Sequence, residues 1–485
     1  MSRPHSILDR YPDYQVVIGI EVHVQLTTNT KIFCSCANQA GADPNTNICI
    51  ICAGYPGVLP MFNKKVLEYA IAVGRATHCS INRNCSFDRK HYFYPDLPKG
   101  YQITQQFEPI CTGGYIPIRH EDGSYKHIRI NRIHMEEDAG KNIHASTSNV
   151  SFVNLNRAGT PLLEIVSEPD ISDAHEAKAY LKMLHTIVRC LGVSTGNMEE
   201  GAFRADTNIS VRKKGDTKLG TKCELKNINS FKFIFDAIEY EIERQITTLQ
   251  DGGTIRQETR LWDGQRTVIM RVKEEATDYR YFQDPDLPLL VIDQEMIDII
   301  ERNLPELPFN TFKRLCQDYG LTAYEADIIV DDSALTRYLD EAMGYYKSKS
   351  IVNWILRDII GYLKEHKITL DQCKVTPRYL ATLVNMVDTG TINNNAAKEV
   401  FMHIAQTGEE PTYIVEQKGL KQIGSAQELE KIVLAIINQH PDSVAEYKAG
   451  KERLFGFFVG KAMQATKGQG NPIIINELLK KHLRN

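Results

Sequence analysis

The amino-acid sequence predicts an α+β fold: an N-terminal domain built on a mixed or antiparallel sheet, then an all-helical domain, then a small helical tail. Residues 15–295 consist mostly of short alternating segments broken by Gly, Pro and Asn, without regular β-α-β alternation. After PDLP at 285–288 the pattern becomes helical, and GEEPTYIVEQKG at 408–419 has the composition of a linker. We therefore predict domains at residues 1–295, 296–407 and 408–485.

The bulk composition is that of a soluble globular protein with more than one domain. The chain has 485 residues, of which 42% are hydrophobic and 24% charged, and its formal net charge is −4. A net charge of this size and sign does not favour binding of the whole chain to nucleic acid or to a membrane surface. The N-terminal residues lack the pattern of a signal peptide, and no apolar run approaches the length of a membrane span. Eleven cysteines without a secretion signal argue against a disulfide framework, so we expect a cytoplasmic protein.

The first strand of the sheet is predicted at residues 18–26, IGIEVHVQL, where apolar residues occupy every second position. Side chains of a strand point alternately to its two faces, so one face is apolar. The other face presents Glu21, His23 and Gln25 in a row. This polar row is either solvated sheet surface or part of a functional site.

Four cysteines form two close pairs near this strand. Cys34 and Cys36 occur as C-S-C, and Cys49 and Cys52 occur as C-I-I-C after a loop of twelve residues. Two such pairs have the spacing of a tetrahedral zinc site. The loop, ANQAGADPNTNI, is polar and rich in turn-forming residues. Because it has no apolar core of its own, a bound metal would be needed to hold its conformation. We predict a zinc knuckle at 34–52; the alternative is four reduced thiols. The other cysteines show no pairing and are predicted to be structural.

Amphipathic segments and capping residues predict the helices. The sheet domain is expected to contain helices at 63–77, 172–191 and 230–251, the last beginning at Ser230, a good N-cap. The helical domain is expected to contain 323–330, 332–347, 350–366 and 377–389, and the tail 427–438, 449–466 and 476–483. From Lys451 to Asn485, five Lys and two Arg stand against two Glu, a balance of +5. The tail is therefore either a phosphate-binding surface or a solvated surface that happens to be basic.

Polar residues at strand spacing collect in the first 230 residues. RADTNISVR places Arg204, Asp206 and Asn208 on one face, and HMEEDAGK supplies Glu136 and Glu137. A solvated sheet face would carry scattered Lys, Thr and Ser, whereas these segments carry carboxylates, Asn, Arg and His. Such side chains suit a divalent cation with a phosphorylated ligand, so the pattern predicts a Mg-nucleotide site. The imidazole of the first strand is unusual there, because imidazole suits Zn²⁺ or Mn²⁺ better than Mg²⁺.

Familiar nucleotide-binding motifs are absent. GDTKLGTK at 215–222 has G-T-K where a P-loop has G-K followed by Ser or Thr, and the strand-like CELKNI follows it. The sequence also lacks the G-x-G-x-x-G of a Rossmann fold. Any nucleotide site here is expected to be non-standard.

Several motifs occur together, and in the same order, in one known family. They are GIEVHVQL, the cysteine pairs with AGYPG, FDRKHYFYPDLPKGYQITQ, HMEEDAGK, NRAGTPLLEIVSEPD, GAFRADTNISVR, KNINSF and DYRYFQDPDLP. From about Tyr14 to the C-terminus the chain resembles the GatB family, the B subunits of the glutamyl/aspartyl-tRNA amidotransferases. Its last block resembles the tRNA-binding tail domain of that family.

The resemblance implies that the sheet domain is a catalytic cradle that uses ATP and Mg²⁺. It would phosphorylate the side-chain carboxylate of Glu-tRNA(Gln), Asp-tRNA(Asn) or both, and ammonia from a glutaminase, the A subunit, would then displace phosphate. A small C subunit would complete the heterotrimer. The paired serines of an amidase nucleophile loop are missing beside the Gly-Gly pairs at 113–114 and 252–253, so ammonia must come from a partner.

The resemblance also implies roles for individual residues. The Mg²⁺ ligands would be Glu21, His23 and Glu137, with Glu164 and Asp206 nearby, and whether Glu136 or Glu137 binds the metal is left open. Further catalytic residues would be Lys90, Lys99 and Arg157. Contacts to ATP or to the acceptor end of the tRNA would come from Arg89, Lys99, Arg157, Arg204 and Asn229. Structural Zn²⁺ would be bound by Cys34, Cys36, Cys49 and Cys52.

Two other kinds of function are compatible with the sequence. A non-catalytic tRNA-binding scaffold would have no ATPase activity and no need for Glu21 or Glu137. An ATP-dependent ligase acting on a free metabolite would not need the basic tail. The choice between the two mischarged tRNAs, and between a bacterial and an organellar source, is left open by the sequence.

Overall fold

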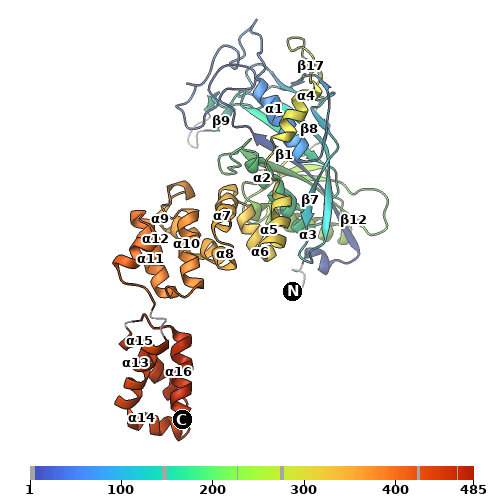
Figure 1. Cartoon of the computed structure of the whole chain (residues 1–485). Coiled ribbons are helices and arrows are strands. Elements are labelled where there is room, and N and C mark those ends of the chain that lie inside the picture. Colours follow the sequence, from blue (N-terminus) through green and yellow to red (C-terminus); the bar gives the residue numbers. More distant parts are fainter. Residues whose placement is uncertain are drawn as a thin grey trace. The chain divides into compact units, whose positions relative to one another are not determined.

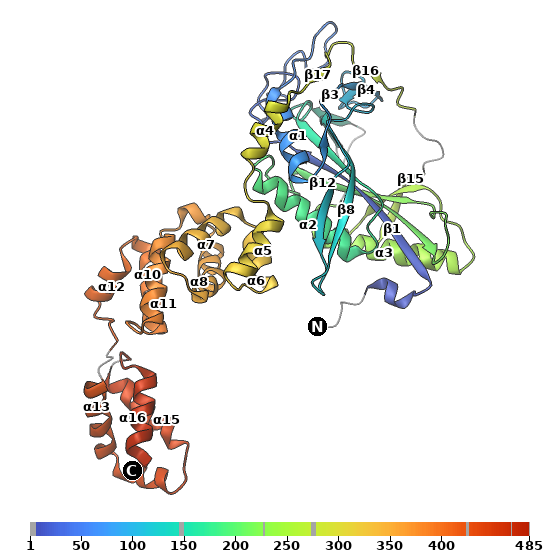
Figure 2. The ribbon, with the colours of Figure 1, turned by 45° about the vertical axis from the view of Figure 1, so that its right-hand side comes forward.

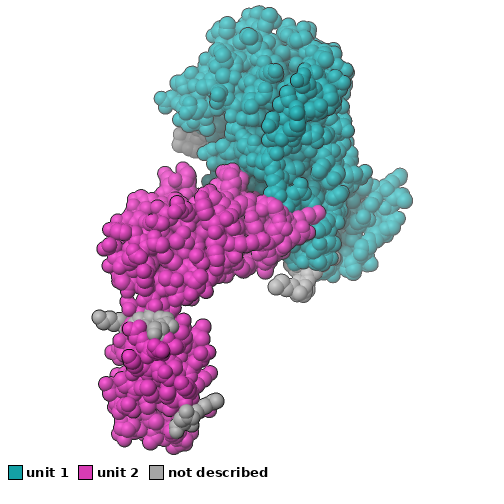
Figure 3. Space-filling view, viewed as in Figure 1, with its two compact units in different colours: residues 1–311 teal, residues 312–485 magenta. Residues whose placement is uncertain are grey.

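The computed structural model describes residues 6–144, 150–226, 228–272, 278–422, 426–466 and 468–484. The chain divides into two compact units, residues 1–311 and 312–485, which Figure 3 colours separately. The described residues of the first unit include every named strand, and the named elements of the second unit are all helical. The predicted α+β layout, with a sheet-rich N-terminal part followed by helices, is confirmed.

A ten-stranded sheet forms the centre of the first unit (Figures 1 and 2). Its strands are β1 (Tyr14–Gln25), β2 (Ser80–Ile81), β6 (Cys111–Thr112), β7 (Tyr115–Arg119), β8 (Tyr125–Glu137), β11 (Pro161–Ser167), β12 (Phe203–Lys213), β13 (Cys223–Lys226), β14 (Glu258–Trp262) and β15 (Thr267–Val272). They run in the order β15-β14-β13-β12-β1-β11-β8-β6-β2, with β7 paired to β8 beside this path. The pairing of β13 with β14 is parallel and the pairings around β1 are antiparallel, so the sheet is mixed.

Smaller sheets lie beside the main one. β4 (Asp88–His91) pairs with β5 (Tyr101–Thr104) and with the short β16 (Phe282–Gln283). β9 (Lys141–His144) and β10 (Ser151–Asn154) form a hairpin, and β3 (Asn84–Cys85) pairs with β17 (Leu290–Val291). The pairing of β16 with β4 brings a segment near residue 280 to one near residue 90.

The alternating pattern of β1 places it at the middle of the large sheet. Val16, Ile18, Ile20, Val22 and Val24 are at most 1% exposed, whereas the residues between them are partly exposed. Both edges of β1 are hydrogen-bonded, to β11 and to β12. The predicted first strand is thus confirmed, with one face in the core and one face polar.

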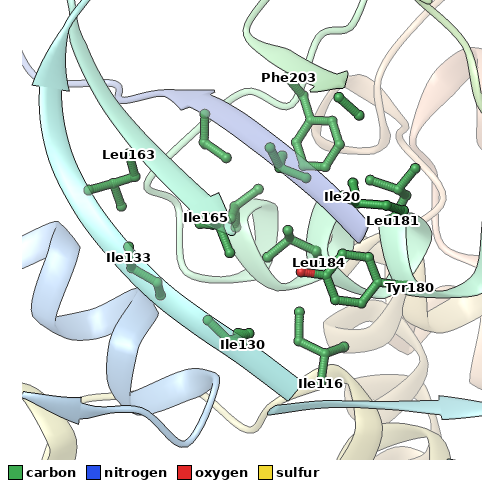
Figure 4. Packing of buried hydrophobic residues seen from close by; sticks show 14 of the residues in the cluster. Ile20, Ile116, Ile130, Ile133, Leu163, Ile165, Tyr180, Leu181, Leu184 and Phe203 are labelled. Carbon is green, nitrogen blue, oxygen red and sulfur yellow. The ribbon is translucent and has the colours of Figure 1, made fainter. Parts of the chain in front are cut away.

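Three helices belong to the core of this unit: α1 (Lys64–Ala76), α2 (Ala174–Cys190) and α3 (Phe231–Gln250). Each begins at a side chain that accepts a backbone N–H, and Ser230 caps α3 as the sequence predicts. Figure 4 shows Tyr180, Leu181 and Leu184 of α2 packed against Ile20 and Ile165 of the sheet. The apolar face of the sheet is therefore closed by helices, which leaves the polar face for a site.

The other helices follow in chain order. They are α4 (Gln294–Arg302), α5 (Pro308–Asp318), α6 (Ala323–Val330), α7 (Ser333–Tyr345), α8 (Lys349–Trp354), α9 (Ile360–His366), α10 (Pro377–Asp388), α11 (Asn394–Thr407), α12 (Pro411–Gln417), α13 (Ala426–Gln439), α14 (Pro441–Lys448), α15 (Leu454–Ala465) and α16 (Pro472–Arg484). Short turns of 3-10 helix occur at Ile7–Arg10 and Leu370–Gln372, and a π-helical turn, Ile355–Ile359, joins α8 to α9 within the helix predicted at 350–366. No helix among the described residues combines the length and apolar character of a membrane span.

The boundaries of these parts differ from those predicted at 295/296 and 407/408. α4 belongs with the sheet, because Ile297 lies in the core of the first unit. α12 belongs with the preceding helices, because Ile414 and Val415 lie in the cluster that runs from Phe312 to Val415. The last cluster runs from Leu429 to Leu483. In both cases an apolar helix face decides which side of the boundary the helix joins.

We expect Ile165→Ala to lower the free energy of unfolding of the first unit by about 2–5 kcal/mol, because it opens a cavity in the sheet core. Ile165 is fully buried, and urea denaturation of the full chain would measure the loss. The control is Ile143→Ala on β9, where the side chain is 42% exposed and the change should stay within about 0.5 kcal/mol. Equal losses for both variants would contradict the described packing.

Candidate active site and metal centres

The strand register lines up polar side chains from four neighbouring strands. His23 of β1 lies opposite Glu164 of β11 and Arg204 of β12, and Glu164 lies opposite His134 of β8. Paired residues of antiparallel strands project to the same face. The four side chains therefore form a row across the polar face, which is the face that the sequence predicted to carry a site.

His23, Glu136 and Glu164 form a compact group in this row. The Nε2 atom of His23 is 3.1 Å from Oε2 of Glu164 and 3.5 Å from Oε1 of Glu136. One ligand atom from each residue lies within 4.8 Å of the others. The buried His134 adds Nε2 contacts of 3.3 Å to Glu164 and 3.6 Å to Glu136, and its Nδ1 atom has no hydrogen-bond partner among the described residues.

The carboxylates of Glu136 and Glu164 stabilise positive charge on the neighbouring imidazoles. Burial acts to lower the pKa of His134, but Glu164 and Glu136 outweigh burial and raise the pKa to about 9. The pKa of His23 is also raised, with burial opposed chiefly by the hydrogen bond to Glu164. Burial acts to raise the pKa of Glu164, yet His134 and His23 hold it well below its ordinary value. Two carboxylates and an imidazole at this spacing are a donor set that fits a divalent cation.

Glu137 does not join this group. Successive residues of a strand face opposite sides, so Glu136 shares a face with His134 while Glu137 shares the opposite face with Met135. Glu137 instead forms an ion pair with Lys99 and accepts the backbone N–H of Ile103 at 2.9 Å. Among the two candidates that the sequence left open, the geometry therefore favours Glu136 over our choice of Glu137. The signal was present in the alternation of HMEE.

Glu21 and Asp206 face each other across β1 and β12, beside the His23 group. Glu21 accepts a hydrogen bond from the Asn208 amide at 3.2 Å. Its pKa is raised by burial first and then by the nearby carboxylates of Glu164 and Asp206. Asp206 forms an ion pair with Lys226, whose Nζ atom also lies 3.1 Å from Glu224. A lysine thus occupies the space beside Asp206, and the sequence did not single out its role.

Most of the predicted cationic residues are paired with carboxylates. Arg204 is 3.0 Å from Asp138, and Arg157 is 3.6 Å from the same carboxylate and donates to the carbonyls of Ala139 and Gly140. Arg89 donates to Asp284 and Asp286 at 2.9 and 2.8 Å.

Lys90 lies over aromatic rings, with its Nζ atom 4.9 Å from the ring centroid of Tyr279. Asn229 is exposed before Ser230, the N-cap of α3, and the described residues offer its side chain no hydrogen-bond partner there. Asn229 therefore forms no described contact with the His23 group.

The four predicted zinc cysteines come together. Their Sγ atoms all lie within 4.8 Å of one another, and Sγ of Cys52 is 3.9 Å from those of Cys36 and Cys49. A zinc ion with Zn–S distances of about 2.3 Å sets tetrahedral S···S edges of about 3.8 Å. All four cysteines are free thiols. Their arrangement fits a structural zinc ion.

A fully buried lysine lies against this cysteine group. Lys31 is 0% exposed, and its Nζ atom is 3.5 Å from Sγ of Cys52 and 2.8 Å from the carbonyl oxygen of Asn47. The pKa of Cys52 is lowered to about 4, chiefly by the hydrogen bond with Cys34 and further by the Lys31 charge. Four thiolates around Zn²⁺ carry a net charge of about −2, so a buried ammonium offsets part of this charge.

The cysteine group and the Lys99–Glu137 pair are close neighbours. They line a small cavity of about 20 Å³ together with Gly159. Gly54, in a left-handed conformation with φ of 71°, approaches so closely that an added Cβ would lie 2.8 Å from the backbone nitrogen of Lys99. A larger cavity of about 550 Å³ lies between α1 and α4 and contains none of the predicted site residues. The candidate site is therefore identified by its side-chain chemistry and not by cavity volume.

Comparison with known proteins gives matches along almost the whole chain. The family model for the GatB/GatE catalytic domain matches residues 16–298, and the model for the GatB domain matches residues 337–483. The chain is 50% identical over 476 residues to the B subunit of the aspartyl/glutamyl-tRNA(Asn/Gln) amidotransferase of Persephonella marina, with 97% of this chain and 100% of the relative covered. The relatives of the same name from Geotalea daltonii and Myxococcus xanthus are 51% and 49% identical, again over 97% of this chain and over 100% and 99% of their own lengths. These matches, which agree with the resemblance carried by the sequence motifs, show that the chain belongs to the GatB family.

Proposed function

We propose that this chain is the ATP-dependent B subunit of an amidotransferase that converts Glu-tRNA(Gln) to Gln-tRNA(Gln), Asp-tRNA(Asn) to Asn-tRNA(Asn), or both. The observation that carries the proposal is the His23–Glu136–Glu164 group on the polar face of the sheet. It lies within the part of the chain that matches the GatB/GatE catalytic domain. Relatives of full length are named as B subunits of aspartyl/glutamyl-tRNA(Asn/Gln) amidotransferases.

The proposed reaction activates a carboxylate and then replaces its oxygen by nitrogen. A carboxylate oxygen of the mischarged amino acid attacks the γ-phosphorus of ATP, and the bond to the β,γ-bridging oxygen breaks with release of ADP. Ammonia then attacks the carbonyl carbon of the acyl phosphate, the C–O bond to phosphate breaks, and the nitrogen loses a proton. Phosphorylation is needed because an oxide is a far poorer leaving group than phosphate.

In this proposal the residues of the chain contribute charge and position. His23, Glu136 and Glu164 would hold Mg²⁺, with Glu21 and Asp206 beside them. When bound, Mg²⁺ neutralises phosphate charge as the phosphoryl group moves. Lys90 would face the phosphate oxygens, whereas Lys99, Arg157 and Arg204 orient the acidic residues with which they pair. Charges fixed before the reaction stabilise the transition state more than solvent could.

The proposal places ammonia production on partner subunits, because the sequence lacks the paired serines of an amidase nucleophile loop beside its Gly-Gly pairs. A glutaminase, the A subunit, and a small C subunit would deliver the ammonia, and the basic C-terminal helices would bind the tRNA backbone. The cysteine group would hold one structural Zn²⁺ and order the loop between its two cysteine pairs. The scaffold and metabolite-ligase alternatives differ from this proposal in the outcome of the following experiments.

We expect Glu136→Gln to lower the rate of ATP-dependent amide formation by about 10²–10³, because it removes one anionic ligand while conserving shape. The assay uses mischarged tRNA with the A and C subunits at limiting Mg²⁺, and tRNA affinity should change little. Glu168→Gln is the matched control, since Glu168 lies beyond the end of β11 and bonds Asn131.

The comparison with Glu137→Gln decides between the adjacent glutamates. We expect this variant to lose less activity than Glu136→Gln, because it breaks the Lys99 pair without removing a ligand. The reverse order would return the metal to Glu137. Wild-type amidation by both variants would support a scaffold whose polar face is merely solvated.

Truncation after Gln422 should weaken tRNA binding by about tenfold or more while ATP hydrolysis stays close to that of the full chain. Phosphate contacts by the basic tail release counterions, so the salt dependence of tRNA binding should become shallower. This cut keeps α12, whose Ile414 and Val415 belong to the preceding core. Filter binding at several salt concentrations measures the effect, and unchanged affinity would locate the tRNA site elsewhere.

Purified metal-replete protein should contain one zinc ion per chain, and Cys49→Ser should reduce the zinc content and the melting temperature of the first unit. Cys190→Ser is the control, because Cys190 is partly buried but lies outside the cysteine group. Elemental mass spectrometry and thermal melts provide the two readouts. Near-zero zinc in the unaltered protein would refute the zinc assignment.

A further inference from the structure

Lys90 differs from the other cationic residues of the candidate site. Lys99, Arg157, Arg204 and Arg89 each form an ion pair with a carboxylate. Among the residues that the structure describes, no carboxylate lies within ion-pair distance of the Lys90 ammonium. A partly buried cation without a counter-ion is costly unless something else stabilises its charge.

Aromatic rings are the groups that lie directly against the ammonium and contribute to that stabilisation. The Nζ atom of Lys90 lies 4.9 Å from the ring centroid of Tyr279 and 5.9 Å from that of Tyr92. The two rings are in edge contact, with centroids 6.3 Å apart, and Tyr281 continues the cluster at 5.9 Å from Tyr279. The backbone fixes this arrangement, because the N–H of His91 donates to the carbonyl of Tyr279 at 2.9 Å.

The ammonium interacts with carboxylates of the sheet through their electric field, and no ion pair joins it to them among the described residues. Burial acts to lower the pKa of Lys90, but Glu136, Tyr281 and Glu164 oppose burial and leave the pKa raised. Glu136 and Glu164 also act on the pKa of Tyr281, after burial and Lys90. Lys90 is thus within electrostatic reach of the His23–Glu136–Glu164 group while its N–H donors stay unshared with that group.

We propose that Tyr92 and Tyr279 are positioning residues that hold the Lys90 ammonium without a counter-ion, so that its N–H groups are free to bind oxygens of the transferred phosphoryl group. The inference rests on the proposed function and adds to it the residues that keep this cation available. The face of an aromatic ring attracts a cation through its quadrupole and carries no net charge. A phosphate that binds Lys90 would therefore meet its full positive charge. A phosphate that binds Lys99 would have to compete with Glu137 for the ammonium.

The test varies the ring at position 279 in the assembled enzyme. Tyr279→Phe keeps the ring and should retain kcat for amide formation within about twofold, whereas Tyr279→Leu should lower kcat by about tenfold. The KM for ATP and the tRNA affinity should change by less than kcat, because the contact strengthens as phosphoryl charge develops. Phenylalanines with increasing fluorine substitution at position 279 should lower the logarithm of kcat stepwise, since fluorine weakens the quadrupole at nearly constant shape.

Tyr69→Leu is the matched control. Lys65 lies 5.0 Å over the Tyr69 ring on α1, so this variant removes a similar cation–ring contact outside the site and should leave kcat unchanged. A flat response across the fluorinated series, or equal activity of the Phe and Leu variants, would overturn the inference. Either result could be obtained while the unaltered enzyme still forms amide from ATP and mischarged tRNA, so failure of the inference is distinct from failure of the proposed function. The fluorinated series also separates ring electrostatics from packing, because its members share one shape.

Discussion

The pairing of β1 with β11 on one edge and with β12 on the other fixes the position of most side chains in the candidate site. This register places His23 opposite Glu164 and Arg204, and Glu21 opposite Asp206. It holds because the opposite face of β1 is buried: a slip of one residue would move Ile18, Ile20 and Val22 out of the core and bring the polar row into it. The apolar packing around α2 therefore positions the polar groups on the other side of the sheet.

The polar face is dominated by acidic residues and is balanced by cations in three different ways. Imidazoles with raised pKa values lie between Glu136 and Glu164. Arginine and lysine pair directly with Asp138 and Asp206. Tyrosine rings stabilise Lys90 without neutralising it. In the proposed function, a metal ion and a phosphate would therefore enter a site whose charges are already arranged, which reduces the reorganisation that accompanies the reaction.

Local patterns predicted part of this structure, and contacts distant in sequence supplied the rest. Alternation identified β1 and the polar face of β12, and spacing identified the cysteine group. Alternation could also have separated Glu136 from Glu137. No local pattern relates Lys99 to Glu137, or Lys90 to Tyr279. The first pair meets only when the β5 segment lies against the end of β8, and the second only when β4 pairs with β16. Similarly, α4 and α12 were not predicted individually as helices. Which domain each helix belongs to depends on the core that buries Ile297 or Ile414.

The burial of Lys31 makes its evolution depend on that of the four cysteines. Its ammonium is 0% exposed and lies 3.5 Å from Sγ of Cys52. Without thiolates nearby, the charge would be left in a closed interior, at a cost of several kcal/mol. Retaining Lys31 after the cysteines are lost is therefore disfavoured. Retaining the four thiolates after an acidic residue replaces Lys31 is disfavoured for the same reason. With the proposed zinc ion bound, the cysteines and Lys31 depend on each other, so natural variants that lack the four cysteines should carry an uncharged side chain in place of Lys31.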